Sequence, residues 1–192
     1  MKGLYIFLGV LVLMIFVGGC GYNGMNSSRV EVDRKFADLQ SSYQRRADLI
    51  PNLVEVVKGV ANFEKTTLTE VIQARANATS IKIDPKDMTA EKLKEFQQSQ
   101  GQLSQALGRL MVVSEQYPQL KANENFKALQ DQIEGTENRI KVSRDSYNEV
   151  VSTYNVKVTS FPNNLLAGVL GFKEKPMFQA EAGAEKAPKV KF

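Results

Sequence analysis

Cys20 is the residue whose neighbours most directly indicate a chemical reaction. It follows Val17, Gly18 and Gly19, and this order resembles the bacterial lipobox, in which an aliphatic residue and two small residues precede a cysteine. Small residues let the chain enter a signal peptidase, and the thiol accepts a diacylglyceryl group. The pattern predicts a lipoprotein whose mature N-terminus is a lipidated Cys20. The alternative that the sequence leaves open is a retained transmembrane helix with an unmodified Cys20.

Other chemistry is limited by the residue types available. The chain has no His and one Cys, which excludes Ser-His-Asp and Cys-His nucleophile systems, His-ligated metals and Cys-rich metal clusters. Glu134 and Glu137 are paired carboxylates one helical turn apart, but this spacing is also typical of an ordinary charged helix face. We therefore expect no enzymatic activity, no cofactor and no metal site.

The elements that position these residues belong to a chain of 192 residues with 25 Lys and Arg and 21 Asp and Glu. This length predicts one domain. The net charge is only +4, and the basic residues are interleaved with acidic ones instead of clustering. The charge pattern therefore disfavours nucleic acid as a partner.

The N-terminus has the composition of a signal peptide or membrane anchor, assigned here to residues 1–19. Gly3–Gly19 is a 17-residue apolar segment. As a helix it would be roughly 26 Å long, close to the shortest length that crosses a bilayer core of about 30 Å. Residues 20–28 are small and uncharged and predict a flexible tether. We assign residues 29–172 to a helical body and residues 173–192, which are rich in Ala, Lys, Glu and Pro, to a flexible tail.

Apolar residues spaced alternately three and four apart predict long amphipathic helices. A capping box of Ser28 and Glu31 predicts the start of the first helix, which continues to about Ala78 with a kink at Pro51. Its stripe is Val32, Phe36, Leu39, Tyr43, Arg46, Ile50, Leu53, Val57 and Val60.

Two further long helices and a short one follow. Thr89 predicts the cap of a second helix that ends before Pro118, and Asn123 the cap of a third that ends before Pro162. A short fourth helix is expected over Leu165–Leu170, closed by Gly171. The fold class is all-α, an antiparallel up-and-down bundle of three long helices plus a short fourth behind the N-terminal segment. A coiled coil between chains is the structural alternative.

Several segments together resemble the LemA family of bacterial membrane-associated proteins. They are Gln44–Val54, Val57–Gly59, Ala74–Ala76, Tyr117–Phe126, Glu134–Ile140, Tyr147-Asn148, Tyr154-Asn155, Phe161-Pro162 and Ala187–Val190. The resemblance implies a helical bundle behind an N-terminal membrane segment, without a known enzymatic activity or an agreed molecular function. The lipobox-like Cys20 departs from the family pattern, because many members resemble uncleaved single-span proteins.

Arg46 is the odd residue of the first stripe, because Leu or Val is expected at its position. In one interpretation its stem packs and its guanidinium reaches water. In the other, helix lengths bring Arg45–Pro51 against the turn Tyr117–Asn125 at the membrane-facing end, where Arg46 or Arg45 bonds turn carbonyls or Glu124. The candidate interaction surface is Arg45, Arg46, Asp48, Pro51, Asn52, Tyr117, Pro118, Asn123, Asn125, Glu134, Glu137, Asn138 and Arg139.

The sequence therefore predicts a membrane-anchored helical interaction or scaffold module of the bacterial cell envelope, tethered to membrane lipid through the N-terminal segment or Cys20. Its expected partner is an envelope protein. The alternative is a structural membrane protein that self-assembles and keeps an uncleaved transmembrane helix. Homo-oligomerisation distinguishes the two, because only self-assembly predicts a defined oligomer without a partner.

Overall fold

The computed structural model describes the chain except residues 1, 61–62 and 180–192, and it leaves out the side chains of residues 2, 4–8, 10–18 and 20. Every regular element in this part is helical, which confirms the all-α class. The long helices are α1 (Lys2–Lys58), α2 (Lys65–Ser80), α3 (Ala90–Ser114) and α5 (Glu124–Thr159). The short ones are α4 (Pro118–Ala122), α6 (Asn163–Ala167) and a 3-10 turn at Pro85–Asp87.

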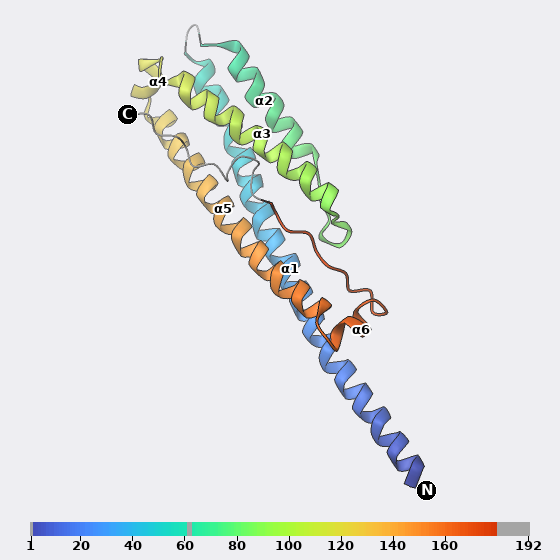
Figure 1. Cartoon of the computed structure of the whole chain (residues 1–192). Helices are drawn as coiled ribbons and strands as arrows, with labels where there is room; N and C mark the ends of the chain where they lie inside the picture. Colours follow the sequence, from blue (N-terminus) through green and yellow to red (C-terminus); the bar gives the residue numbers. More distant parts are fainter. Residues whose placement is uncertain (1, 61–62, 180–192) are drawn as a thin grey trace, which may run out of the picture.

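The four long helices run in alternating directions (Figure 1). α1 and α5 form the most extensive pair, and α2 and α3 form a hairpin against the half of the molecule that lies farther from the N-terminus. The N-terminal part of α1 projects beyond the other helices.

The first predicted helix is wrong beyond Lys58. The chain turns at Gly59, and α2 runs back along α1. This reversal lets Phe63 and Val71 join the core, which a straight continuation of α1 would have left without partners. Pro51 lies inside α1 without ending it, as expected.

The start of that helix also differs from the prediction. α1 begins at Lys2, so Ser28 and Glu31 lie inside a helix and form no capping box. Ser28 Oγ instead accepts a hydrogen bond from Lys157 Nζ at 2.6 Å. Residues 20–28 are helical, with Met25 fully buried, so the expected flexible conformation of the tether is wrong.

Local signals at the other helices are confirmed. Thr89 caps α3 by accepting from the Lys92 backbone N–H. Asn123 caps α5 by accepting from the N–H groups of Asn125 at 2.9 Å and Phe126 at 3.2 Å. The short helix α6 spans Asn163–Ala167 instead of the expected Leu165–Leu170, and Gly171, with a φ of 76° in the left-handed region that favours glycine, lies four residues beyond its end.

The apolar interior divides into two cores along the molecule. The proximal core lies nearer the N-terminus and is rich in aromatic side chains, among them Phe36, Tyr43, Phe96, Tyr147, Tyr154, Phe172 and Phe178. The distal core is mainly aliphatic and includes Ile50, Leu53, Val57, Val71, Leu103, Leu107, Leu110, Leu120 and Ile133.

An extended segment, residues 173–179, closes the proximal core; we call it the strap. Asn155 accepts from the Lys175 backbone N–H at 2.8 Å and donates to its carbonyl at 2.9 Å. Asn148 makes the same pair of bonds with Phe178, at 2.9 and 3.0 Å. The predicted flexible tail is therefore wrong over 173–179, because this backbone is paired. Residues 180–192 lie outside the described part.

The N-terminal predictions stay predictions. Most side chains of the apolar segment Gly3–Gly19, and that of Cys20, lie outside the described residues. Within the described residues, no helix combines the length and apolar character that crossing a membrane requires.

Candidate interaction site

Arg46 is the centre of a polar layer between the two cores. Its side chain is 1% exposed. Its Nη1 donates to Glu137 Oε1 and to Ser104 Oγ, both at 2.6 Å. Its Nη2 donates to Gln100 Oε1 at 2.6 Å and to the Gln100 carbonyl at 3.2 Å. One guanidinium thus connects α1 with α3 and α5, and the interpretation in which it reaches water is wrong.

Gln100 extends the layer to α2, the one long helix that Arg46 does not bond. Its Nε2 donates to the Ala78 carbonyl at 3.0 Å, near the end of α2. This carbonyl belongs to the last turn, where no further helical N–H is available. Gln100 therefore accepts from α1 and donates to α2 with one buried amide.

Pro51 contributes a second bond between α1 and α2. A proline has no N–H, so it leaves the carbonyl four residues earlier, that of Ala47, without its helical donor. Arg75 Nε of α2 donates to this carbonyl at 2.8 Å. Gln44–Val54 and Ala74–Ala76, two of the segments that carry the family resemblance, therefore contact each other.

A phenol ring also faces the guanidinium. The Arg46 guanidinium carbon lies 5.3 Å from the ring centre of Tyr43. Burial raises the pKa of Tyr43, and the nearby positive charges of Arg144 and Arg46 partly offset that rise. Tyr43 therefore stays neutral at physiological pH and closes the proximal side of the layer.

The predicted meeting of Arg45–Pro51 with Tyr117–Asn125 is wrong in its partners and its position. Arg46 bonds neither the turn carbonyls nor Glu124. Tyr117 instead packs on Phe63, with ring centres 4.8 Å apart, at the end of the molecule remote from the N-terminus. The first helix ends at Lys58 and not near Ala78, so α3 reaches its turn beside the end of α1.

Most of the predicted surface residues are separate from this layer. Glu137 joins it, with its side chain 36% exposed, and Tyr117 and Asn123 are half-buried. The exposed ones are Arg45, Asp48, Pro51, Asn52, Pro118, Asn125, Glu134, Asn138 and Arg139. Because Arg46 is buried, it positions helices and is not itself part of an accessible surface.

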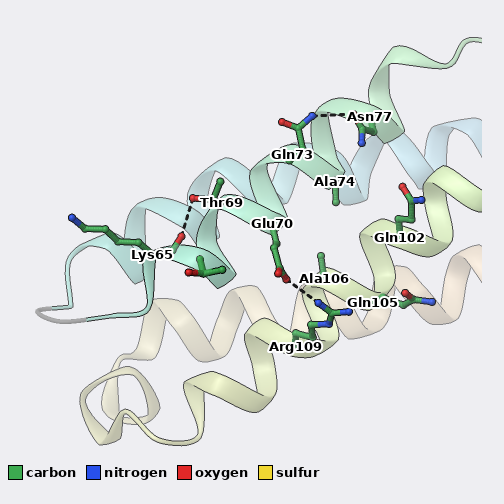
Figure 2. Close-up of a pocket in the computed structure, with 11 residues that line it drawn as sticks. Lys65, Thr69, Glu70, Gln73, Ala74, Asn77, Gln102, Gln105, Ala106 and Arg109 are labelled. Carbon is green, nitrogen blue, oxygen red and sulfur yellow. Dashed lines mark hydrogen bonds and ion pairs between the residues drawn. The ribbon is translucent and has the colours of Figure 1, made fainter.

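A groove between α2 and α3 is a candidate site that the sequence reasoning missed. It has a volume of about 670 Å³. Ala74 and Ala106 line it, and Glu70 of α2 reaches Arg109 of α3 across it at 3.1 Å (Figure 2). Gln73, Asn77, Gln102 and Gln105 add amide groups.

A signal for the groove was present in the spacing. Glu70, Gln73 and Asn77 follow one another at steps of three and four residues, and so do Gln102, Gln105 and Arg109. Such spacing places each set on one helix face. Two polar faces with a small alanine in each predict a shallow groove lined with hydrogen-bonding groups where the helices pair.

Comparison with known proteins gives a family and several relatives. The model of the LemA family matches residues 35–192. Magnetosome protein MamQ 2 of Paramagnetospirillum magneticum is 28% identical over 181 residues, covering 85% of this chain and 66% of that protein. Magnetosome protein MamQ of Magnetospirillum gryphiswaldense is 26% identical, covering 93% and 72%. Protein LemA of Metamycoplasma hominis is 25% identical, covering 82% and 68%. The chain thus spans about two thirds of the length of these relatives.

Proposed function

We propose, starting from the fact that this chain belongs to the LemA family, that it is a membrane-attached helical interaction module of the bacterial cell envelope. It presents the α2–α3 groove to a partner protein. The proposal assigns no catalytic step to the chain. Its attachment is the N-terminal segment, either through lipid on Cys20 or as a retained helix.

The continuity of α1 is the observation that carries this proposal. One helix of 57 residues contains both the apolar segment and the central helix of the body. Ala47 marks the level of the groove on α1, because its carbonyl accepts from Arg75 of α2. From Gly19 to Ala47 the helix rises roughly 42 Å at about 1.5 Å per residue. A membrane that holds the apolar segment therefore holds the groove at a fixed height above its surface.

The groove favours a polar protein segment as partner. Its four amide groups offer both donors and acceptors, and the Glu70–Arg109 pair offers one charge of each sign. These groups complement a peptide backbone or polar side chains better than an apolar ligand. An exposed ion pair contributes little to folding, about 0–1 kcal/mol, so its charges can be redirected to a partner at small cost.

Site-specific photocrosslinking in the native bacterium tests the interaction. Benzoylphenylalanine replaces Gln102 or Gln105 in the groove and, as a matched control, Asp131, which is exposed on α5. We expect a discrete adduct from the groove positions and none from the control. Absence of groove-specific adducts overturns the proposal, and an adduct of twice the chain mass supports the self-assembling alternative.

Intact mass distinguishes the two attachment modes. The membrane-extracted protein is compared with its Cys20→Ser variant. Loss of residues 1–19 with added lipid mass, abolished in the variant, supports the lipoprotein. An unprocessed chain in both samples supports the retained helix, and a chain found outside the membrane fraction overturns attachment.

A further inference from the structure

Four large apolar side chains are exposed within ten residues, at the end of the helical body from which the N-terminal part of α1 projects. Phe161 is 79% exposed, Leu165 66%, Val169 86% and Leu170 41%. They belong to the segment 161–170, which includes α6 and follows α5; we call it the foot. Single exposed apolar residues are ordinary on a protein surface, whereas a concentration of this kind marks a contact with another phase or molecule.

The foot is fixed to α1 immediately after the apolar segment. A Cβ on Gly21 would lie 2.7 Å from Asn163 Oδ1, so α1 passes close to the first residue of α6 at this point. The ring of Tyr22 contacts that of Phe172 edge to face, with centres 5.6 Å apart. Ala167 and Phe172 are buried against the proximal core, which turns Phe161, Leu165 and Val169 outward. In Figure 1, α6 lies beside α1 at the point where the N-terminal part projects.

We propose that the foot is a second membrane contact, in which Phe161, Leu165 and Val169 enter the interfacial layer of the lipid bilayer. This inference rests on the proposed function, because it takes the N-terminal segment to be held at a membrane. Gly21 lies only two residues, or roughly 3 Å, beyond Gly19 along the helix axis. The foot is therefore at the height where the apolar segment ends.

The inference holds for both modes of attachment. A retained helix spanning Gly3–Gly19 ends at the interface, next to the foot. A lipidated Cys20 places its acyl chains in the bilayer and Gly21 at the headgroups, which is again the level of the foot. Interfacial contacts combine apolar side chains with nearby basic residues. Lys173 is exposed, lies close to the foot in the chain and supplies that charge.

Tryptophan fluorescence tests the foot directly, because the chain has no Trp. The full chain carrying Phe161→Trp or Val169→Trp is reconstituted in phosphatidylcholine–phosphatidylglycerol vesicles with or without bromine on the acyl chains. Tyr22→Trp reports the attachment itself. Val112→Trp is the matched control, because Val112 is 70% exposed in the last turn of α3.

We expect bromine to quench the fluorescence of the Phe161→Trp and Val169→Trp chains at least twofold relative to the Val112→Trp control, with emission shifted to shorter wavelength. Quenching at Tyr22→Trp alone overturns the foot and leaves the attachment intact. Absence of quenching at Tyr22→Trp as well overturns the attachment together with the foot. A shifted emission at position 161 without quenching means that protein covers the foot, and it also overturns the inference.

Discussion

The proximal and distal cores share α1, α3 and α5 but are closed by different walls. Helix α2 closes the distal core, and the extended strap closes the proximal one. A helix pairs its own backbone groups internally, whereas an extended segment must find partners elsewhere. The proximal core therefore needs polar side-chain atoms to pair the backbone of the strap, whereas most backbone groups of α2 are paired within the helix.

Tyrosine and asparagine on α5 supply those polar atoms. Tyr147 donates to the Pro176 carbonyl at 3.0 Å and Tyr154 to the Lys173 carbonyl at 2.9 Å. Asn148 and Asn155 bond the strap through their amides. The core beside the extended strap is thus aromatic, because tyrosine side chains combine an apolar ring with a hydroxyl that bonds the strap backbone. The core beside helix α2 can be aliphatic, because the helix pairs its own backbone.

The spacing of the two Tyr-Asn pairs matches the geometry of the strap. The pairs are seven residues apart on α5, or about 10.5 Å. Lys175 and Phe178 are three residues apart on the strap, or about 10 Å in extended conformation. Two turns of α5 therefore span the same distance as three residues of the strap, so both asparagines can reach the strap backbone.

The boundary between the cores is where a single change should have the largest effect. Arg46→Ala leaves Glu137 and the buried Gln100 without their partner, and we expect a loss of about 3–5 kcal/mol in the free energy of unfolding. The double change Arg46→Met with Glu137→Leu leaves no charge without a partner and should lose less. Urea unfolding of the full chain in detergent micelles measures both, and equal losses would contradict this account of the layer.

The strap should respond next. Asn155→Ala removes both bonds to Lys175, and we expect about 1–3 kcal/mol of destabilisation with faster hydrogen exchange at the Lys175 and Phe178 amides. Amides of the distal core should keep their exchange rates. Asn138→Ala is the control, because Asn138 is exposed on the same helix. Unchanged exchange along the strap would show that the strap does not depend on this amide.

High pH should weaken the proximal core selectively. Burial, and to a lesser extent Asp33, raises the pKa of Tyr147 well above its usual 10.0. Burial likewise raises the pKa of Tyr154. The folded state therefore keeps protons that the unfolded state releases. The resulting stability is complete below about pH 10 and falls above it, by about 1 kcal/mol per pH unit for one such group.

Denaturant unfolding at pH 9, 10 and 11 checks the sign of this dependence. Tyr147→Phe is expected to reduce the slope above pH 10, whatever its effect on stability at neutral pH. A slope identical to that of the unsubstituted chain would mean that Tyr147 does not cause it.

The smallest expected effect concerns the α1–α2 contact beside the distal core. Arg75→Ala should cost about 1 kcal/mol, because the Ala47 carbonyl loses its donor. In a Pro51→Ala background the restored N–H of residue 51 supplies that donor, so the same change should cost almost nothing. A double-mutant cycle measures this coupling, and additive effects would contradict the pairing of Pro51 with Arg75.

Local rules predicted much of the fold from the sequence. The stripes correctly marked Phe36, Ile50, Leu103 and Ile140 as buried. The caps at Thr89 and Asn123 depend only on neighbouring residues, and both are confirmed. These features require no knowledge of which elements meet.

The errors concern features that depend on distant partners. The stripe of the first predicted helix ends at Val60, but only the packing of α2 against α1 shows that the chain reverses at Gly59. The strap lacks helical periodicity, so its order depends on side chains of α5 some 20 to 30 residues earlier. Arg46 stood out in its stripe, but its bonding partners come from two other helices and no spacing rule could identify them.

The polar layer also fixes how α1 can move. Sliding α1 by one helical turn along α5, about 5.4 Å, would carry Arg46 away from Glu137 and Gln100 at once. The layer therefore allows only one register of α1 against α5. A force applied along α1 is consequently passed on as a tilt or rotation of the whole helical body, and not as a stepwise shift of one helix past another.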